Sequence, residues 1–299
     1  MPHQVGVTKR GRAIIMALPE SAVGMSVAQQ PNIDAYFERI GFSGSIAPTL
    51  ETLSQLHQLH PAAIAYENLD PLMGVPVRLG LANLQQKLVF DRRGGYSFEQ
   101  NGLFAAVLSD LDYGVKLHGA RVLLGLPEGE EPSVGHMVLT VEAAGITYLC
   151  DVGFGGMTPT APLRLRNGVE QQTPLEPYRL TETDGVWLLE MQRGEAWVAL
   201  YDFTLEELPE AQITVLSDVA DSSPLFNGRL LAARVERNRR LALNDLTLDI
   251  RAPGAPDERR VLTSVAELRE VLSGLMEIEL PSSDRLDPAL ERILAKGAG

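Results

Sequence analysis

Histidine is the side chain that most often acts as a general base near neutral pH, and the chain has five: His3, His57, His60, His118 and His136. His57 and His60 lie three residues apart on an expected helix, which favours a surface or capping role, and no HExxH pattern makes them a zinc pair. His118 lies inside an expected strand and is interpreted as structural. His136 follows the turn-forming residues 132–135 and opens the apolar strand 137–141, so it is expected at a strand end, where sites are often built. His136 is therefore the candidate base.

Asp151 is the candidate partner of that histidine. It follows the apolar strand 146–150, fifteen residues after His136. A hairpin that joins the two strands would bring the carboxylate beside the imidazole, where it could fix the tautomer of the ring and stabilise its cation. An aspartate at a strand end also caps turns, and that alternative stays open.

Ser97 is the candidate nucleophile, in the segment Arg93-Gly-Gly-Tyr-Ser-Phe-Glu-Gln-Asn. The two glycines permit a tight turn, and the apolar spacing after them predicts a helix with Ser97 in its first turn. Unpaired N–H groups there favour an anion, so a nucleophile at this place would be activated. The alternative is that Ser97 simply caps the helix. The segment is not the GxSxG pattern of an α/β-hydrolase.

The elements that must position these residues change in type along the chain. Helical spacing marks residues 32–88 and 98–111. Short β-rich runs follow at 118–124, 136–142, 147–154, 178–181, 186–192 and 196–202, which indicates an antiparallel sheet or small barrel. Residues 230–237 and 240–251 are predicted as strands, and 265–274 and 288–295 as helices. This order predicts an α+β protein in three consecutive units.

Composition limits the classes of protein and of site. The 299 residues carry 26 Lys and Arg against 39 Asp and Glu, a net charge of −13, which disfavours nucleic-acid binding. The single cysteine, Cys150, excludes an internal disulfide and cysteine-cluster metal sites. No apolar run reaches the length of about 18 residues that a membrane helix needs.

The N-terminal residues imitate a secretory signal without completing one. Lys9, Arg10 and Arg12 precede the apolar residues 13–18, but Pro19 and Glu20 end that stretch early. Residues 1–30 are interpreted as a flexible extension that includes His3, with export as the alternative. Together with the lack of paired cysteines, this favours a cytoplasmic location.

Taken together, these segments resemble the arylamine N-acetyltransferase family. Residues 34–41 are similar to the family's opening helix, and residues 65–70 to its FENLD-like segment. Residues 93–101 match the family's RGGxCxExN motif except at the cysteine, and residues 136–139 and 148–155 match its histidine and aspartate motifs. In that family a Cys-His-Asp triad takes an acyl group from acyl-coenzyme A and passes it to an aromatic amine or hydrazine.

The resemblance implies a fold and a set of site residues. The fold is an α+β arrangement of an N-terminal helical bundle (31–112), a central antiparallel β-barrel (113–215) and a C-terminal α/β lid (216–299). The implied catalytic residues are Ser97, His136 and Asp151; the substrate-binding residues are Tyr66, Phe154, Gly155 and Phe226; and the supports of the site are Arg93, Gly94, Gly95, Glu99 and Asn101. Ordinary core packing is the alternative for the aromatic residues, and a simple turn for residues 153–156.

The resemblance also implies the partners. The donor is acetyl-CoA or another acyl-CoA as a co-substrate, and the acceptor is an arylamine, arylhydrazine or hydrazide, in a ping-pong mechanism. No bound cofactor, metal, nucleic acid or membrane is implied, and the state is a monomer or a homodimer. No Walker A or GxGxxG loop is present, so surface Lys or Arg that the sequence does not identify would hold the nucleotide end of CoA.

Ser97 is the one departure from the family motif. Cys150 is a poor substitute because neighbouring residues of a strand point to opposite faces. A serine hydroxyl must lose its proton during attack, whereas an imidazole can convert a thiol to a thiolate, so the exchange should lower the rate. Ser97 is an engineered Cys-to-Ser substitution, a natural serine nucleophile, or the mark of a homologue that binds acyl-CoA or aromatic amines without turnover. The rest of the motif is intact, which weakens the last of these accounts, and we favour the first. An amide synthase of natural-product biosynthesis is the alternative activity.

Overall fold

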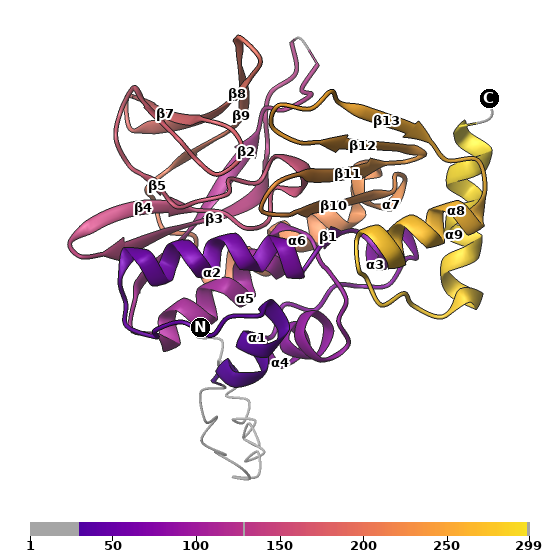
Figure 1. Ribbon diagram of the computed structural model, residues 1–299, viewed down its shortest axis with the longest axis horizontal. Helices are drawn as coiled ribbons and strands as arrows, with labels where there is room; N and C mark the ends of the chain where they lie inside the picture. The colour runs from indigo at the N-terminus through magenta and orange to yellow at the C-terminus, as the bar shows by residue number, and fades with distance from the viewer. Residues whose placement is uncertain (1–29, 128, 298–299) are drawn as a thin grey trace, which may run out of the picture.

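The computed structural model describes residues 30–297 except residue 128, so nearly all of the expected N-terminal extension lies outside the described residues. The helical part consists of α1 (Ile33–Ile40), α2 (Leu50–Ala63), α3 (Leu69–Leu72), α4 (Leu81–Leu84) with the π-helical turn Gln85–Phe90, and α5 (Ser97–Asp110). The side chain of Asn32 accepts the N–H of Ala35 at 3.0 Å and starts α1, and Gly41, with a φ of 70°, ends it. Apolar faces of α1, α2 and α5 share one core with strands of the barrel (Figure 1).

The central part is an eight-stranded antiparallel sheet that is nearly closed into a barrel. Its strands lie in the order β5 (Leu163–Arg164), β4 (Ile146–Cys150), β3 (Val134–Ala143), β2 (Gly114–Val122), β9 (Ala196–Thr204), β8 (Val186–Arg193), β7 (Tyr178–Thr183) and β6 (Val169–Gln171). Alternate residues of these strands fill the interior, among them Tyr178, Leu189 and Tyr201. The β3–β4 hairpin predicted from the sequence is present, with Leu139 opposite Cys150.

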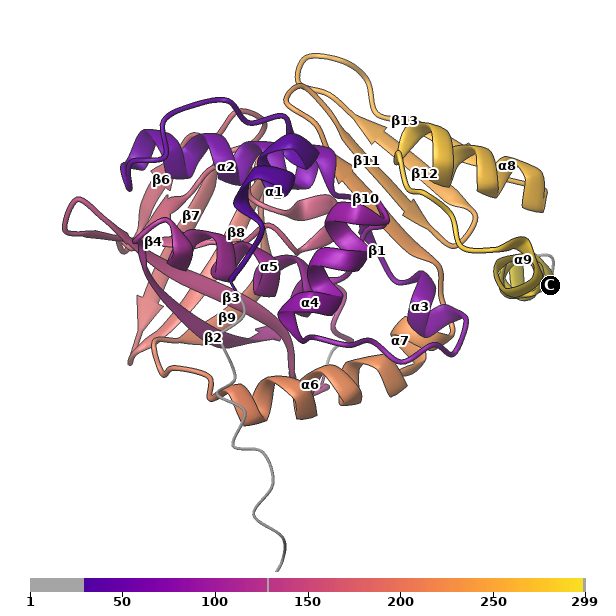
Figure 2. The ribbon, with the colours of Figure 1, turned by 90° about the horizontal axis from the view of Figure 1, so that it is seen from below.

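The C-terminal part is a five-stranded sheet backed by helices. Its order is β1 (Tyr66–Glu67), β10 (Leu231–Val235), β11 (Arg240–Asn244), β12 (Thr247–Arg251) and β13 (Glu258–Val261). One face packs on α8 (Val265–Glu270), the π-helical turn Val271–Leu275 and α9 (Ser283–Gly297) through residues such as Leu243. The other face turns toward the barrel, where the 3-10 turn η2 (Gly155–Met157) meets it. Figure 2 shows the helices on the outer side of this sheet and the barrel on its inner side.

The α+β class and the bundle, barrel and lid architecture are confirmed. The prediction of one strand over residues 240–251 is wrong, because a turn at Asp245, whose φ is 52°, folds it into the β11–β12 hairpin. The helices α6 (Glu210–Ser222) and α7 (Pro224–Asn227) were not predicted. Val215 and Val219 on α6 are 60% and 61% exposed, so its apolar residues do not form the single buried stripe that marks a surface helix.

The exact domain boundaries stay a prediction. β1 belongs to the N-terminal segment in sequence but to the C-terminal sheet in space, and α6 crosses the expected boundary at residue 215. Within residues 30–297, residue 128 aside, no helix is long and apolar enough to cross a membrane.

Candidate active site

Ser97 is the first residue of α5, at the bottom of a cleft between the barrel and the five-stranded sheet. Tyr96 occupies the N-cap position, and its N–H donates to the carboxylate of Glu99 at 3.1 Å. The interpretation of Ser97 as a helix cap is therefore wrong. Its side chain makes no hydrogen bond within the described part of the chain and lines the cleft beside unpaired N–H groups of the first helical turn.

The imidazole of His136 and the carboxylate of Asp151 form a hydrogen-bonded pair. Nε2 of His136 lies 2.7 Å from Oδ2 of Asp151, and both side chains are buried. His136 enters from the start of β3, and Asp151 directly follows β4, so the hairpin brings them together. Since Nε2 faces the carboxylate, Nδ1 is the nitrogen left to exchange a proton with a nucleophile.

Asp151 is fully buried and remains a carboxylate because three groups stabilise its charge. Oδ1 accepts hydrogen bonds from Nδ2 of Asn101 and from the N–H of Gly153, both at 2.9 Å. Burial alone would raise the pKa of Asp151, but the charge of His136 and the hydrogen bonds from His136, Asn101 and Gly153 outweigh it and hold the pKa below its usual value. The ionised carboxylate can therefore orient and stabilise the imidazolium.

Gly153 joins the aspartate loop to the nucleophile helix. A Cβ atom at this position would lie 2.9 Å from Cα of Ser97 and 3.1 Å from Nδ2 of Asn101. Asn101 completes the connection, since its Nδ2 also donates to the carbonyl of Met137 at 2.6 Å and its Oδ1 accepts the N–H of Val152 at 2.9 Å. Ser97, His136 and Asp151 thus converge at one place, as their sequence motifs predicted.

Aromatic side chains form the walls of the site. The ring of Phe154 meets the ring of His136 edge-on at 4.9 Å between centroids, and Tyr201 lies 5.0 Å from the same ring. Tyr66, Phe154, Gly155 and Phe226 all line the cleft. Tyr201 was missed by the sequence analysis, because a tyrosine in a barrel strand has no local signal.

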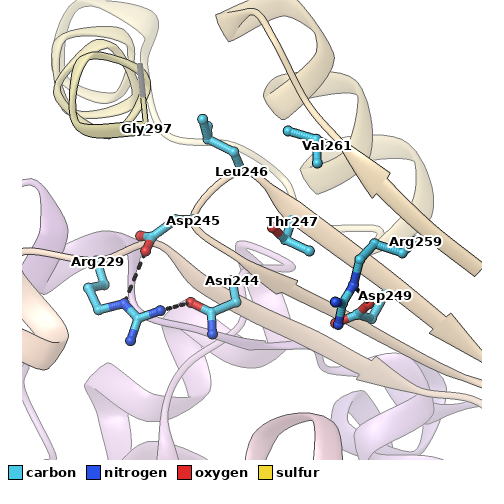
Figure 3. Close-up of a pocket in the computed structure, with 9 residues that line it drawn as sticks. All are labelled: Arg229, Asn244, Asp245, Leu246, Thr247, Asp249, Arg259, Val261 and Gly297. Carbon is cyan, nitrogen blue, oxygen red and sulfur yellow. Dashed lines mark hydrogen bonds and ion pairs between the residues drawn. The ribbon is translucent and has the colours of Figure 1, made fainter. Parts of the chain in front are cut away.

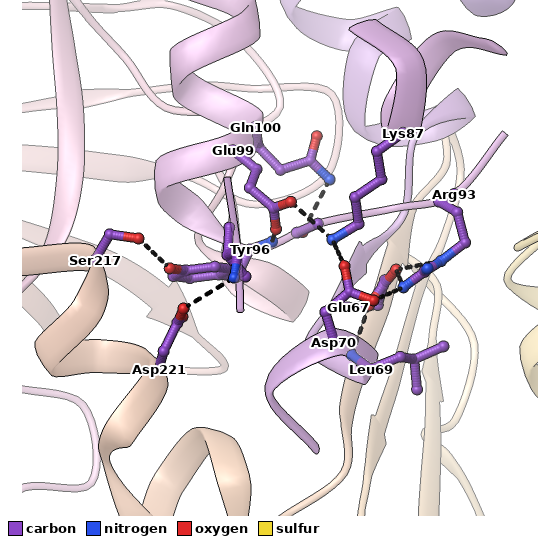
Figure 4. A network of polar contacts seen from close by, with 12 residues as sticks. Glu67, Leu69, Asp70, Lys87, Arg93, Tyr96, Glu99, Gln100, Ser217 and Asp221 are labelled. Carbon is purple, nitrogen blue, oxygen red and sulfur yellow. Dashed lines mark hydrogen bonds and ion pairs between the residues drawn. The ribbon is translucent and has the colours of Figure 1, made fainter. Parts of the chain in front are cut away.

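A buried ionic cluster lies beneath the turn that precedes Ser97 (Figure 4). Arg93 binds Glu67 at 2.8 Å and Asp70 at 2.9 Å, and Lys87 binds Asp70 and Glu99, each at 2.7 Å. Burial, assisted by the neighbouring carboxylates and opposed by Lys87, raises the pKa of Glu99 to about 7. Neither Arg93 nor Glu99 lines the cleft, so both act on the shape of the turn.

The two glycines of this turn lie against neighbouring atoms. A Cβ on Gly94 would lie 2.1 Å from the carbonyl oxygen of Ala65, and one on Gly95 would lie 2.6 Å from Oε2 of Glu99. The turn therefore needs glycine at both positions.

His57 and His60, the α2 histidine pair, are fully buried, so the expectation of a surface or capping role was wrong. Nε2 of His57 accepts the N–H of Asp151 at 3.2 Å, and Nε2 of His60 lies 2.7 Å from Oε1 of Gln100. Burial lowers the pKa of His57 to about 4 and that of His60 to about 3, so both are neutral at pH 7. Because their sequence neighbours are polar, the face of α2 that packs on α5 could not be recognised from the sequence.

His118 and Cys150 have no place in the cleft. Both nitrogens of His118 are hydrogen-bonded, to the carbonyl of Glu206 and to the hydroxyl of Thr140, which confirms its structural interpretation. Cys150 is fully buried in the core between helices and barrel, and burial raises the pKa of its thiol. Its side chain therefore does not replace Ser97. Within the described residues no group of three or more His, Cys, Asp or Glu side chains could hold a metal ion.

Comparisons with known proteins agree with this geometry. The family model described as N-acetyltransferase matches residues 49–285. The protein named arylamine N-acetyltransferase from Mycobacterium tuberculosis H37Rv is 38% identical over 277 residues, which cover 90% of this chain and 98% of that protein. The structure of Mycobacterium marinum arylamine N-acetyltransferase in complex with CoA is 39% identical, with a TM-score of 0.84, and covers 88% of this chain and 99% of that one.

A more distant structure agrees as well. That of arylamine N-acetyltransferase from Salmonella typhimurium is 31% identical, with a TM-score of 0.82, over 90% of this chain and 100% of that one. The matched family model spans most of the chain, and these relatives are covered almost end to end. The chain therefore belongs to the arylamine N-acetyltransferase family.

Proposed function

We propose that this chain moves an acetyl group from acetyl-CoA to an arylamine, arylhydrazine or hydrazide by a ping-pong mechanism. The observation that carries the proposal is the 2.7 Å contact of His136 with a charged, buried Asp151, in the same cleft as the unbonded hydroxyl of Ser97. Relatives named arylamine N-acetyltransferase, one of them with CoA bound, support the choice of acceptor and donor.

In the first half-reaction, Oγ of Ser97 attacks the thioester carbonyl while Nδ1 of His136 takes the hydroxyl proton. N–H groups at the start of α5 stabilise the oxyanion. The carbon–sulfur bond then breaks, and His136 gives the proton to the sulfur of the departing CoA. Asp151 stabilises the imidazolium between these transfers.

In the second half-reaction, the nitrogen of the acceptor attacks the acyl carbon. The bond from that carbon to Oγ of Ser97 breaks, His136 takes a proton from the amine and returns one to the serine, and the N-acetyl product leaves. Tyr66, Phe154 and Phe226 offer the aromatic surface on which an aryl acceptor stacks.

The test restores the family's nucleophile. Ser97→Cys should raise transfer from acetyl-CoA to an arylamine or hydrazine by orders of magnitude, because a thiolate–imidazolium pair needs no proton transfer during attack. Ser109→Cys, at an exposed position of α5, is the matched control and should change nothing. An unchanged rate in Ser97→Cys would contradict the proposal. Transfer only from a carrier-bound acyl chain would favour an amide synthase, and CoA binding without transfer would favour a silent binding protein.

A cytoplasmic location and a monomeric or homodimeric state stay predictions from the sequence.

A further inference from the structure

Phe226, an aromatic residue of the cleft wall, lies on a helix that is too short to fix its own position. α7 has only the four residues Pro224–Asn227, and so short a helix is not stable by itself. Phe226 lines the cleft together with Ser97, and its buried ring packs on the ring of Tyr96, with 5.2 Å between the two centroids. Contacts with other segments must therefore hold the backbone of Phe226 in place.

Asn68 makes such a contact, although its place in the chain favours another role. It occupies the N-cap position of α3, where an asparagine side chain usually accepts an N–H group of the first helical turn. The side chain of Asn68 makes no such bond, and Oε2 of Glu67 accepts the N–H of Leu69 at 2.6 Å instead. The side-chain amide of Asn68 is therefore available to bind another segment.

The amide of Asn68 binds the segment that leads from α7 to β10, 158 to 163 residues further along the chain. Nδ2 donates to the carbonyls of Phe226 and Arg229, and Oδ1 accepts the N–H of Leu231, each at 2.8 Å. Carbonyls at the end of a helix need such partners, because the helix itself supplies none. With two acceptors beside its NH₂ group and one donor beside its oxygen, the fully buried side chain satisfies both ends of the segment.

The turn between β11 and β12 holds the same segment at another point. Nε of Arg229 donates to Oδ2 of Asp245 at 3.0 Å, as Figure 3 shows, and the N–H of Leu230 donates to Oδ1 of the same carboxylate at 2.9 Å. These two bonds fix residues 229 and 230, whereas the Asn68 amide reaches the carbonyl of Phe226 itself. Asn68 therefore holds the backbone that carries the aromatic ring.

Tyr66, a second aromatic residue of the cleft wall, lies shortly before Asn68 in the chain. It belongs to β1, which pairs with β10, and the backbone N–H of Asn68 extends this pairing by donating to the carbonyl of Leu231 at 3.2 Å. Tyr66 and Phe226 pack in one apolar cluster, and both line the cleft. Asn68 thus joins two aromatic wall residues that come from distant parts of the chain.

We infer that Asn68 is a positioning residue for the acceptor: by holding the ring of Phe226 at the cleft wall, it makes the second half-reaction selective for acceptors with an aromatic ring. Asn68 does not itself line the cleft, so it acts through Phe226 and touches no substrate. Contact with a well-placed aromatic ring strengthens the binding of an aryl group by roughly three- to tenfold. The inference rests on the proposed function, since it names what selects the acceptor of that reaction.

Steady-state kinetics in the Ser97→Cys background tests this inference, because kcat/KM for each substrate of a ping-pong reaction reports only that substrate's half-reaction. Asn68→Asp keeps an acceptor for the N–H of Leu231 and loses the donors to the two carbonyls. We expect kcat/KM for phenylhydrazine to fall by roughly three- to tenfold, and kcat/KM for methylhydrazine and for acetyl-CoA to change by less than about twofold. Asn68→Ala, which adds no charge at this buried position, should give the same result.

Asn167→Asp is the matched control. The amide of Asn167 also binds a distant backbone position, donating to the carbonyl of Glu182 at 3.4 Å and accepting its N–H at 2.9 Å, but Asn167 is exposed and does not line the cleft. This variant should leave all three kcat/KM values unchanged. In a Phe226→Leu background, Asn68→Asp should lower the ratio of kcat/KM for phenylhydrazine to kcat/KM for methylhydrazine no further, because the ring through which Asn68 acts is gone. An undiminished fall in that background would overturn the inference.

Hydrogen exchange tests the hydrogen bonds of Asn68 without any turnover. Asn68→Asp and Asn68→Ala should speed amide exchange in residues 226–231 at least about tenfold, and Asn167→Asp should not. Thermal unfolding midpoints show that each variant is folded. If both this exchange and the ratio for the two hydrazines stay unchanged in the Asn68 variants, the inference is overturned while the proposed function stands. If the Ser97→Cys parent acetylates neither hydrazine, the proposed function falls and the selectivity with it.

Discussion

Replacing Asp151 by asparagine in the Ser97→Cys background should lower kcat/KM by about 10³- to 10⁴-fold, although the two side chains have nearly the same shape. Oδ1 of Asp151 accepts hydrogen bonds from Asn101 and Gly153, so the amide oxygen of the asparagine must stay on that side. The amide NH₂ group then faces Nε2 of His136 at the place where Oδ2 was 2.7 Å away.

The loss follows from the tautomer of His136. Nε2 must accept a hydrogen bond from the new amide, so the proton moves to Nδ1, and the nitrogen that should act as base becomes a donor. The variant also loses the negative charge that stabilises the imidazolium. Three to four decades of rate correspond to about 4 to 5.5 kcal/mol of transition-state stabilisation.

Steady-state transfer from acetyl-CoA to an arylamine measures kcat/KM, and the pH dependence of thiol alkylation reports the state of the nucleophile. The thiol should titrate at higher pH in the Asp151→Asn variant, because the imidazolium partner is lost. Asp110→Asn, the same change at an exposed carboxylate at the end of α5, is the control. A kcat/KM within about threefold of the parent would refute the role given to Asp151.

Three further predictions concern the frame of the site. Gly153→Ala should lower the free energy of unfolding, measured in urea, by about 1 to 3 kcal/mol and reduce acyl transfer, because the new Cβ would lie 2.9 Å from Cα of Ser97. Gly135→Ala, with open space around its Cβ, is the control and should be nearly neutral. Equal losses in the two variants would contradict this prediction. Lys87→Met should lower the free energy of unfolding by about 3 to 5 kcal/mol, because it leaves the buried carboxylate of Glu99 without its cation, whereas Asp70 keeps Arg93; a loss under about 1 kcal/mol would argue against a buried pair. The free energy of unfolding should fall by about 2 kcal/mol from pH 7 to pH 5. The folded-state pKa values of the α2 histidine pair, about 4 and about 3, lie below the ordinary 6.5, so only the unfolded chain takes up these protons, and each histidine lowers the free energy of unfolding by about 2 kcal/mol. Glu99, with a folded-state pKa of about 7, takes up its proton in the folded chain and raises the free energy of unfolding by about 2 kcal/mol. Urea titrations at the two pH values measure this change, and a higher free energy of unfolding at pH 5 than at pH 7 would contradict the prediction.

The sequence predicted that Ser97, His136 and Asp151 would lie together because the signals for them are local. Asp151 follows an apolar strand, His136 opens one, and the glycines before Ser97 mark a tight turn, so each motif can be found within about ten residues. The β3–β4 hairpin then brings together His136 and Asp151, which only fifteen positions separate in the sequence, so their pairing needs no contact between distant segments.

The parts that the sequence did not predict depend on contacts between distant segments. His57 looks like a surface residue beside its polar neighbours, yet it is buried because α5 and the aspartate loop cover it. Tyr201 lies in a barrel strand like any core tyrosine, and only the folding of the barrel brings its ring to 5.0 Å from that of His136. Such contacts leave no periodic signal along the chain.

The central claim is that acyl transfer passes through residue 97, with Cys150 taking no part. Mass spectrometry of the Ser97→Cys protein, incubated with acetyl-CoA and no acceptor and then digested, tests this most directly. We predict one acetyl group, on the peptide that contains residue 97, which disappears when an arylamine is added. An acetyl group on Cys150, or none on either peptide, would contradict the account.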